Sequence, residues 1–564
     1  MTTKDHKGGR FENFIFGILN VPAKSLLVML LIFASLAGAI MMLPTKIVLA
    51  KMLPGKSTNT FTIYVDMPKG SSINQTTIVS QCVTNVMKKE SEVLDMEVFL
   101  GQGAPLDYAG LVKGSGMKMS VEFAEIVINL SDKNSREEKS FNMVQRLRPV
   151  IKDACQPIVK GTVIKMTEMP AGPPTLASIV LEVYGKNNMK TIVLAAEVAD
   201  ILQRTDGLVD VDIMADERYK KYVLSPIVEK ASQSGLSIKQ VNQILYLAFE
   251  GMGVAVKNTI DLNDQISIFV ALSEESQTIE KDTEKLLKNK LSQLSLMNMK
   301  GMMIPLTEVV EIQEELSVPM IYHKNLKTMV NVVAETDMVS QVYPLLDTRE
   351  QMIEQFSDRY IVTKVPGITT YMFDLMLEDK TTAEEFLLRF DGEMKVTLDT
   401  FRDLGGAFIA ALILIFLLLV VYYKSFALSG IVLGGSFLSI IGVIVGHWVA
   451  NLVTDETFFL TATSLIGFIA LMGISSRNSL LLIDFAQGLI KDKGIEKRRA
   501  IAIASATRAK PIMLTAIAII LGSALLASDP VFGGLGVALI SGTIAAVIVS
   551  LLFVPILLNR TKSI

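Results

Sequence analysis

The chain has 564 residues, of which 50% are hydrophobic and 20% are charged, and its mean hydropathy is +0.43. So apolar an average excludes an ordinary soluble enzyme and indicates several membrane spans. The charged fraction nevertheless requires a large region in contact with water. The formal net charge is −3, and the sequence shows no basic cluster typical of a nucleic-acid-binding groove. We therefore expect no nucleic-acid partner.

The first apolar run, residues 25–43, carries no charge and has about the length that a bilayer requires. It lacks the small-residue cleavage motif of a signal peptide, so we expect a retained transmembrane helix that follows a cytoplasmic segment, residues 1–24. Five further apolar stretches fill residues 404–558 and are followed by a short tail, residues 559–564. The sequence therefore predicts one helix, a large insert, and five more helices.

Basic residues set the predicted orientation. The loop 491–510 between two apolar stretches holds seven Lys or Arg residues against two acids, and the N-terminal segment and the tail are also basic. Cytoplasmic loops of membrane proteins carry an excess of positive charge. We therefore expect both termini in the cytoplasm and the insert outside it, which in a bacterium with two membranes means an inner-membrane protein with a periplasmic domain.

The insert alternates strand-like and helix-like segments. Residues 61–66 alternate like a strand, and residues 72–89 and 140–154 have the length and spacing of helices. Units of strand, helix and strand that follow one another at this spacing indicate small α+β sandwiches of the ferredoxin-like kind. The proline-rich stretch at 169–174 predicts a boundary between such units.

The cysteines and histidines of this sequence do not form a recognisable catalytic or metal-binding pattern. Cys82 and Cys155 lack metal-ligand spacing, and we expect them to be small buried thiols rather than a disulfide. The three histidines, His6, His323 and His447, are scattered. With no nucleophile triad and no phosphate loop, we expect neither an enzyme nor a cofactor or metal site.

Several segments resemble one known family. Residues 470–486 (ALMGISSRNSLLLIDFA), 508–526 (RAKPIMLTAIAIILGSALL) and 529–558 resemble the last three membrane helices of resistance–nodulation–division (RND) transporters, the proton-driven pumps of tripartite efflux systems. Residues 52–72 (MLPGKSTNTFTIYVDMPKGSS) are similar to the start of the second porter half, and 169–185 to the entry to the docking lobe. The resemblance covers essentially the whole chain, but only the C-terminal half of a usual twelve-helix pump.

The resemblance implies a half-size or split-gene permease subunit. Its fold would be a bundle of six transmembrane helices with an α+β periplasmic porter and docking domain between helices 1 and 2. The expected divisions are a porter lobe at 44–178, a docking or outer lobe at 179–319 and a second porter lobe at 320–403. The implied partners are a complementary N-terminal-half RND subunit, a periplasmic adaptor, an outer-membrane channel, small-molecule substrates and membrane lipid.

Arg477 is the one basic residue deep inside an apolar span. A charge at that depth is expensive, and it is a functional hypothesis by default. The resemblance places a lysine there that pairs with two aspartates on the other half of the pump. A guanidinium stays charged, so we expect Arg477 to act as a fixed counter-charge to a titrating carboxylate rather than as the proton carrier.

Three more residues complete the predicted proton relay. Asp484 lies seven residues after Arg477, and Thr515 lies seven after Arg508, so each pair shares a helix face. Arg508 and Thr515 match positions of the family's proton pathway. Each residue also has an alternative interpretation. Asp484 can be a solvated residue near the cytoplasmic end, and Arg508 can be one of the positive charges that keep a loop in the cytoplasm. Thr515 can be a threonine whose hydroxyl bonds back to its own helix.

The other five spans contain no carboxylate in their cores, so the titrating acids must come from a partner half. We expect export of hydrophobic or amphiphilic compounds. The 29 methionines leave copper or silver export as an alternative, because clustered thioethers bind soft metal ions. A Sec-type protein-export accessory and a non-transporting scaffold are further alternatives, although a scaffold gives no reason for Arg477.

Overall fold

The computed structural model describes residues 9–562, except 54–56, 106–107, 134, 169–174, 216–217, 260–264, 273–282, 338–339, 341, 366–372, 455–457 and 530. The boundary expected at 169–174 lies outside these residues. The chain divides into two compact units: residues 1–66, 79–214 and 322–564 form the first, and residues 67–78 and 215–321 form the second.

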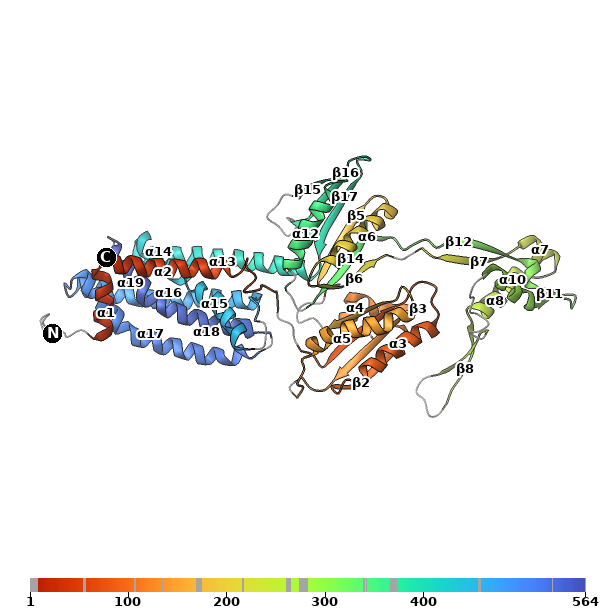
Figure 1. The fold of residues 1–564 in the computed structure, drawn as a ribbon, viewed down its shortest axis with the longest axis horizontal. Coiled ribbons are helices and arrows are strands. Elements are labelled where there is room, and N and C mark those ends of the chain that lie inside the picture. The colour runs from red at the N-terminus through yellow and green to blue at the C-terminus, as the bar shows by residue number, and fades with distance from the viewer. Residues whose placement is uncertain are drawn as a thin grey trace. The chain divides into compact units, whose positions relative to one another are not determined.

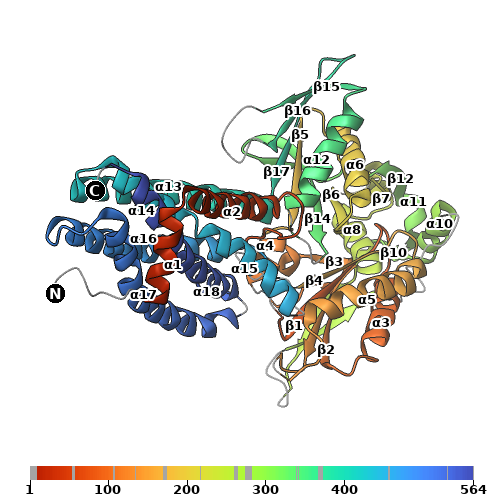
Figure 2. The same cartoon turned by 60° about the vertical axis from the view of Figure 1, so that its left-hand side comes forward.

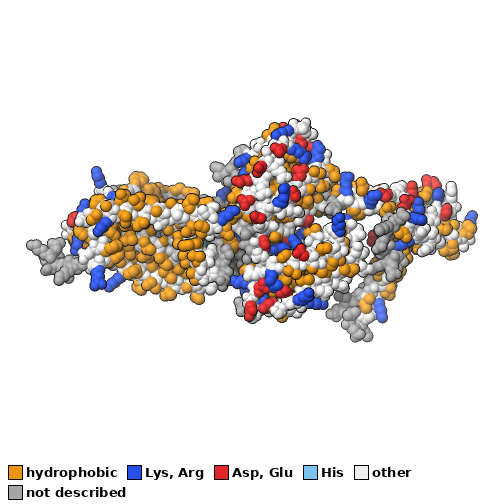
Figure 3. Space-filling model, viewed as in Figure 1, with side chains coloured by type: hydrophobic (Ala, Val, Ile, Leu, Met, Phe, Trp, Pro, Cys, Tyr) orange, Lys and Arg blue, Asp and Glu red, His pale blue; other side chains and the backbone are white. Residues whose placement is uncertain are grey.

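The first unit contains a bundle of long apolar helices (Figures 1 and 2). Among the described residues, six helical segments have the length and composition to cross a membrane. These are α2 (Pro22–Met41), α13 (Glu393–Tyr423), α14 with α15 (Phe426–Phe437 and Ile440–Val453), α16 (Ala462–Lys491), α17 (Lys497–Ala527), and α18, η4 and α19 (Gly533–Ile548, Val549–Phe553 and Val554–Arg560). Hydrophobic side chains cover the visible face of this bundle (Figure 3), as expected of a surface that faces lipid.

The segment 1–24 holds more structure than we expected. Helix α1 (Arg10–Asn20) buries Ile15, Ile18 and Leu19 in the core of the bundle, and α2 already begins at Pro22. Glu12 is also buried, and its carboxylate lies 3.0 Å from the Arg499 guanidinium at the start of α17. Residues 10–20 therefore form an amphipathic helix that packs on the bundle rather than a simple extension.

Residues 60–66 and 79–168 of the first unit form lobe A. Its elements follow the order β1 (Thr60–Asp66), α3 (Ile73–Met87), β2 (Val93–Gln102), β3 (Met119–Leu130), α5 (Ser140–Cys155) and β4 (Val163–Glu168). The four strands pair antiparallel in the order β2-β3-β1-β4. This β-α-β-β-α-β connection is that of a ferredoxin-like unit. Two short helices, α4 (Tyr108–Lys113) and η1 (Ser115–Met117), lie between β2 and β3.

The expectation of free thiols is wrong, because Cys82 and Cys155 form a disulfide. Cys82 lies on α3 and Cys155 ends α5, with Cα atoms 5.7 Å apart. The two cysteines are 73 residues apart in sequence, and only the fold brings their helices together. Disulfides persist in oxidising compartments and are rare in the cytosol.

Lobe B is built from two separated parts of the chain. Its sheet contains β5 (Ile179–Gly185), β6 (Leu208–Met214), β13 (Tyr322–Lys324), β14 (Lys327–Thr336), β15 (Tyr360–Lys364), β16 (Leu375–Asp379) and β17 (Glu385–Asp391). Strand β14 pairs with both β5 and β6, and β17 pairs with β5. Helices α6 (Asn188–Arg204) and α12 (Val342–Phe356) belong to the same lobe.

The docking lobe was expected at 179–319, and the structure divides that range between two bodies. Residues 179–214 belong to the sheet of lobe B, and the second compact unit starts at residue 215. That unit pairs β7 (Lys220–Pro226) with β12 (Val310–Leu316) as a two-stranded ribbon. Between them lie α7 (Val228–Gln233), α8 (Ile238–Phe249), α10 (Thr283–Gln293), α11 (Leu306–Val309), and the hairpins β8–β9 (Met252–Lys257 and Ile266–Val270) and β10–β11 (Ser295–Met297 and Met303–Pro305).

We expect the disulfide to raise the free energy of unfolding of lobe A. Replacing both Cys82 and Cys155 with Ser should lower the free energy of unfolding of lobe A by about 2–4 kcal/mol, because the link restricts the unfolded chain. Denaturant unfolding of the purified protein measures this change. A reducing agent should destabilise the wild-type chain equally and leave the Cys82→Ser/Cys155→Ser variant unchanged; equal stability of both proteins without reductant would contradict the prediction.

Candidate functional site

Arg477 lies on an uncovered face of the helical bundle. It is the sixteenth residue of the 30-residue helix α16, so it sits near the middle of the span. Its side chain is exposed, as are those of Ile466, Ala470 and Leu481, while Gly473 leaves open space on the same face. These positions recur at intervals of three or four residues and define one stripe, which we call the Arg477 stripe.

No hydrogen bond or ion pair to another described residue holds the Arg477 side chain. The opposite face of α16 is buried in the bundle, with Leu471, Ser475 and Leu482 fully covered. Charged side chains inside a membrane usually face the interior of a bundle or a wet cavity, and they pair. Arg477 does neither within the described part of the chain.

Asp484 is held by tyrosines. Its two carboxylate oxygens accept hydrogen bonds from the hydroxyl groups of Tyr422, at 3.1 Å, and Tyr423, at 2.9 Å. Both tyrosines end α13, so the bonds join α13 to α16 at one end of the bundle. The spacing in the sequence predicted that Asp484 and Arg477 share a helix. No sequence pattern indicated that Asp484 would pair with Tyr422 and Tyr423.

Arg508 and Thr515 share α17, and neither contacts Arg477 in the described structure. The guanidinium of Arg508 lies 4.9 Å from the centre of the Phe485 ring, beside Asp484, and its Nε atom is buried without a hydrogen-bond partner among the described residues. Thr515 donates back to the carbonyl oxygens of Pro511 and Ile512 at 3.0 and 2.9 Å. The structure thus places Arg508 against Phe485, the residue after Asp484 in the sequence, and it gives Thr515 the back-bonded geometry.

His447 belongs to a buried polar chain that the sequence did not indicate. Its Nδ1 lies 2.8 Å from the Val443 carbonyl oxygen, and its Nε2 lies 2.8 Å from the Ser464 hydroxyl, which continues to Thr461 at 3.0 Å. A carbonyl can only accept, so Nδ1 carries the proton and Nε2 accepts from Ser464 in the neutral ring. The chain ties α15 to the start of α16 and satisfies every polar atom of the imidazole.

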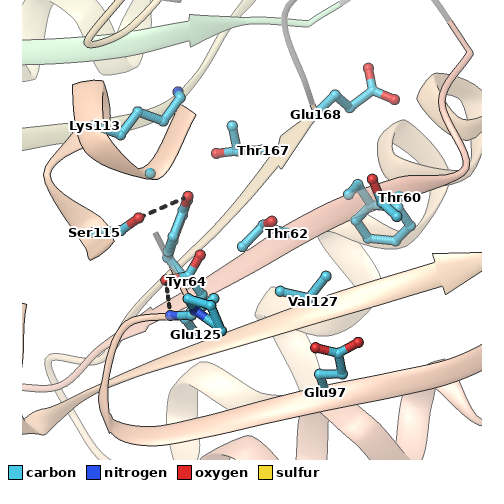
Figure 4. A pocket seen from close by; sticks show the side chains of 14 residues that line it. Thr60, Thr62, Tyr64, Glu97, Lys113, Ser115, Glu125, Val127, Thr167 and Glu168 are labelled. Carbon is cyan, nitrogen blue, oxygen red and sulfur yellow. Dashed lines mark hydrogen bonds between the residues drawn. The ribbon is translucent and has the colours of Figure 1, made fainter. Parts of the chain in front are cut away.

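Lobe A contains a cavity of about 250 Å³ on the face of its sheet that α4 and η1 cover (Figure 4). Alternate residues of β1, Thr60, Thr62 and Tyr64, line it, whereas Ile63 and Val65 point into the core. The remaining lining residues are Phe61, Glu97, Ala104, Pro105, Gly110, Lys113, Ser115, Glu125, Val127, Thr167 and Glu168. Hydroxyl groups and carboxylates predominate, and these fourteen residues include no Met, Cys or His.

The acids of the cavity have different surroundings. Glu125 is buried and accepts a hydrogen bond from the Ala104 N–H at 2.9 Å. Glu168 has a buried Oε1 without a hydrogen-bond partner among the described residues. Burial raises the pKa of Glu168 to about 7, against the smaller lowering effects of the Ser140 hydroxyl and the Arg148 charge. Glu168 therefore titrates near neutral pH.

Comparison with known proteins decides the family. A family model described as the AcrB/AcrD/AcrF family matches residues 3–358 and 374–560. The chain belongs to the AcrB/AcrD/AcrF family. Its members are RND efflux transporters and not enzymes, so the resemblance found in the sequence is confirmed.

Curated relatives and solved structures agree with this membership. The chain is 23% identical over 567 aligned residues to the swarming motility protein SwrC of Bacillus subtilis (strain 168), and 21% identical over 564 to the multidrug export protein AcrF of Escherichia coli (strain K12). Each alignment covers 98% of this chain, but 47% and 49% of those relatives. The chain therefore spans about half the length of the curated relatives it matches.

The fold is similar to that of a heavy metal efflux pump solved in two crystal forms. The TM-scores are 0.72 and 0.70 at 16% sequence identity, and the alignments cover 98% and 97% of this chain and 52% and 51% of the pump. At this identity the likeness shows the fold alone. The family match and the long apolar helices indicate a multi-pass membrane protein with a large soluble domain.

The titration of Glu168 predicts a pH dependence. In the unfolded chain this carboxyl ionises near its ordinary pKa, whereas in lobe A it keeps its proton until about pH 7. Between these two values the folded state binds more protons, so the free energy of unfolding falls as pH rises, by about 3 kcal/mol in total.

Denaturant unfolding at about pH 5 and pH 8 measures the effect, and Glu168→Gln should remove most of it because a glutamine does not ionise. Glu97→Gln, a change to an exposed residue of the same cavity, serves as the control and should behave like the wild type. A Glu168→Gln variant with an undiminished pH dependence would contradict this assignment.

Proposed function

We propose that the chain forms half of a proton-driven RND efflux pump, and that Arg477 is the fixed counter-charge to carboxylates on a second six-helix region of the same family. The observation that carries the proposal is Arg477 itself, which is exposed in the middle of an apolar helix and has no partner among the residues that the structure describes. An arginine keeps its charge, so the titrating groups must be acids that face it. The half-length match to full-size relatives is consistent with a missing second region.

The proposed cycle needs only a change in charge at those acids. When a facing carboxylate is ionised, it pairs with Arg477 and draws the two helical regions together. When it is protonated, the pairing is lost, and the helices relax to another packing. Gly473 and Ala470 beside Arg477 are small, and small residues allow helices to approach closely in a membrane. Asp484, Arg508 and Thr515 are proposed as the continuation of the proton path.

We propose the lobe A cavity as a substrate site for amphiphilic compounds that carry a positive charge. Three carboxyl groups line it with a single lysine, and the Lys113 charge is balanced by Glu335 at 2.9 Å. Phe61 and Val127 supply apolar contact. Export of copper or silver is a second candidate, favoured by the similarity to a heavy metal efflux pump. The cavity argues against it, because its lining residues offer no soft sulfur ligand.

The proposed location is an inner membrane, with lobes A and B and the second unit on the periplasmic side. The basic loop 491–510 supports a cytoplasmic position for the opposite end of the bundle. The disulfide in lobe A supports an oxidising compartment for the insert. RND pumps generally work with an adaptor and an outer-membrane channel, and we assign the contact with them to the second unit, residues 215–321.

Substitution of Arg477 tests the proposal. Arg477→Ala should abolish substrate export without loss of expression, since removing one partner of a buried ion pair commonly costs roughly 3–5 kcal/mol and leaves the facing acid protonated. Arg477→Lys should retain part of the activity, because it restores the charge without the guanidinium geometry. Efflux from cells with matched surface expression is the measurement.

Lys491→Ala, at the end of α16, is the matched control and should export like the wild type. Wild-type efflux from a well-expressed Arg477→Ala variant would show that the protein merely tolerates this charge, and the proposed role would then be wrong.

A further inference from the structure

A short hairpin of the second unit exposes four methionines. Met297, Met299, Met302 and Met303 all lie within residues 297–303, and their exposed fractions are 64%, 98%, 53% and 60%. Methionine is usually buried in folded proteins, and a single exposed one needs no explanation. Four exposed thioethers in so short a segment do need one, and the proposed export function does not use them.

The strand register places two of these side chains directly opposite each other. Met297 of β10 pairs with Met303 of β11, next to the loop that joins the two strands. Side chains of directly opposed residues share one face of a hairpin, with Cβ atoms about 4.5–5.5 Å apart. Each methionine adds a flexible stem beyond its Cβ atom, so the two sulfur atoms can meet at a common ion. Met299 and Met302 belong to the joining loop, residues 298–302.

Asn298 holds the backbone of this loop in place. It is buried, and its Oδ1 accepts hydrogen bonds from the backbone N–H groups of Lys300 at 2.9 Å and Met302 at 3.0 Å. Its Nδ2 donates to the Ser234 carbonyl oxygen at 2.9 Å, which fixes the loop to the end of α7. Gly301 takes a φ of +77°, which a glycine adopts without strain. The loop backbone is thus preorganised, so a ligand that binds there has less conformational entropy to remove.

The donor atoms that this hairpin offers are soft and uncharged. Thioethers select soft monovalent cations such as Cu(I), whereas Mg²⁺ and Ca²⁺ require oxygen ligands. Residues 295–305 contain no Asp, Glu, His or Cys. Both cysteines of the chain are in the disulfide, so no thiol competes for a soft ion. Lys300 is the one charged residue of the loop; it is exposed, and water and salt weaken its repulsion of a cation.

We propose that residues 297–303 form a binding site for a soft monovalent cation, Cu(I) or Ag(I), with the thioethers of Met297 and Met303 as the central ligands and those of Met299 and Met302 as supporting ligands. The site belongs to the second unit, whereas the lobe A cavity belongs to the first. Its chemistry does not depend on whether the chain exports metal. A contact surface for another protein is the competing role of exposed methionines, and the experiment separates the two.

Silver tests the site in the purified full chain, because Ag(I) is stable in air and prefers the same soft ligands as Cu(I). Isothermal titration calorimetry in a chloride-free buffer should find a single strong Ag(I) site per chain. Mild oxidation with hydrogen peroxide, followed by mass spectrometry, then locates the site, since a sulfur atom bound to metal is protected from oxidation. Protection should cover residues 297–303 and not Met117 and Met119, which are 77% and 86% exposed in lobe A.

Met297→Leu/Met303→Leu should weaken Ag(I) binding at least about tenfold, because leucine keeps an apolar side chain of similar size but removes the opposed sulfur atoms. Met117→Leu/Met119→Leu is the matched control, since it removes two exposed thioethers from lobe A, and it should leave the affinity unchanged. Met299→Leu should weaken binding by a smaller factor. Its side chain is almost fully exposed, so this variant keeps the fold even if the double variant does not.

The affinity should also stay constant between about pH 6 and pH 8, because a thioether does not titrate there, whereas a histidine does. No Ag(I) binding, undiminished binding by a folded Met297→Leu/Met303→Leu variant, protection at Met117 and Met119 instead, or binding that is lost in acid would each overturn the proposal. Residues 297–303 would then be an apolar contact surface. The assay involves no substrate or proton gradient, so its result is independent of whether the chain exports anything.

Discussion

A single charge in lipid constrains the membrane half of this protein. Arg477 sits near the middle of a 30-residue apolar helix, on a face that the rest of the described bundle leaves open. Hydrocarbon offers no counter-ion and no hydrogen bond, so an exposed guanidinium at that depth is unfavourable unless another surface covers it. In the proposed function a second helical region satisfies this group, and the small residues that flank Arg477 would leave room for its close approach.

In the soluble region, charged side chains are also paired between two bodies, but here both bodies belong to this chain. Lobe A presents cations and lobe B presents anions, and a bulge in β6 carries the Asp210 carboxylate across the contact to Arg148 and Lys152. In both the membrane and the soluble regions, the chain places charges where two bodies meet rather than within one hydrophobic core. Such contacts are specific in geometry, and neutralising one partner weakens them.

Much of this arrangement could be predicted from the sequence, because it depends on local patterns. The apolar stretches coincide with helices α2 and α13–α19, and the alternation at 61–66 coincides with β1. Features that depend on distant parts of the chain could not be predicted. The Cys82–Cys155 disulfide requires α3 and α5 to be neighbours, and the pairing of β6 with β14 spans a whole inserted unit. The pairing of Asp484 with two tyrosines likewise depends on how α13 packs against α16.

The central claim is that another protein surface, and not lipid, covers the Arg477 stripe. A photoreactive amino acid at Gly473, where the structure leaves open space, tests it in native membranes. The same group at Leu525 of α17, which is 82% exposed, is the control. The account predicts that the Gly473 probe captures a helix of a second six-helix region that carries carboxylates, while the Leu525 probe captures lipid. Lipid adducts alone at both positions would contradict it.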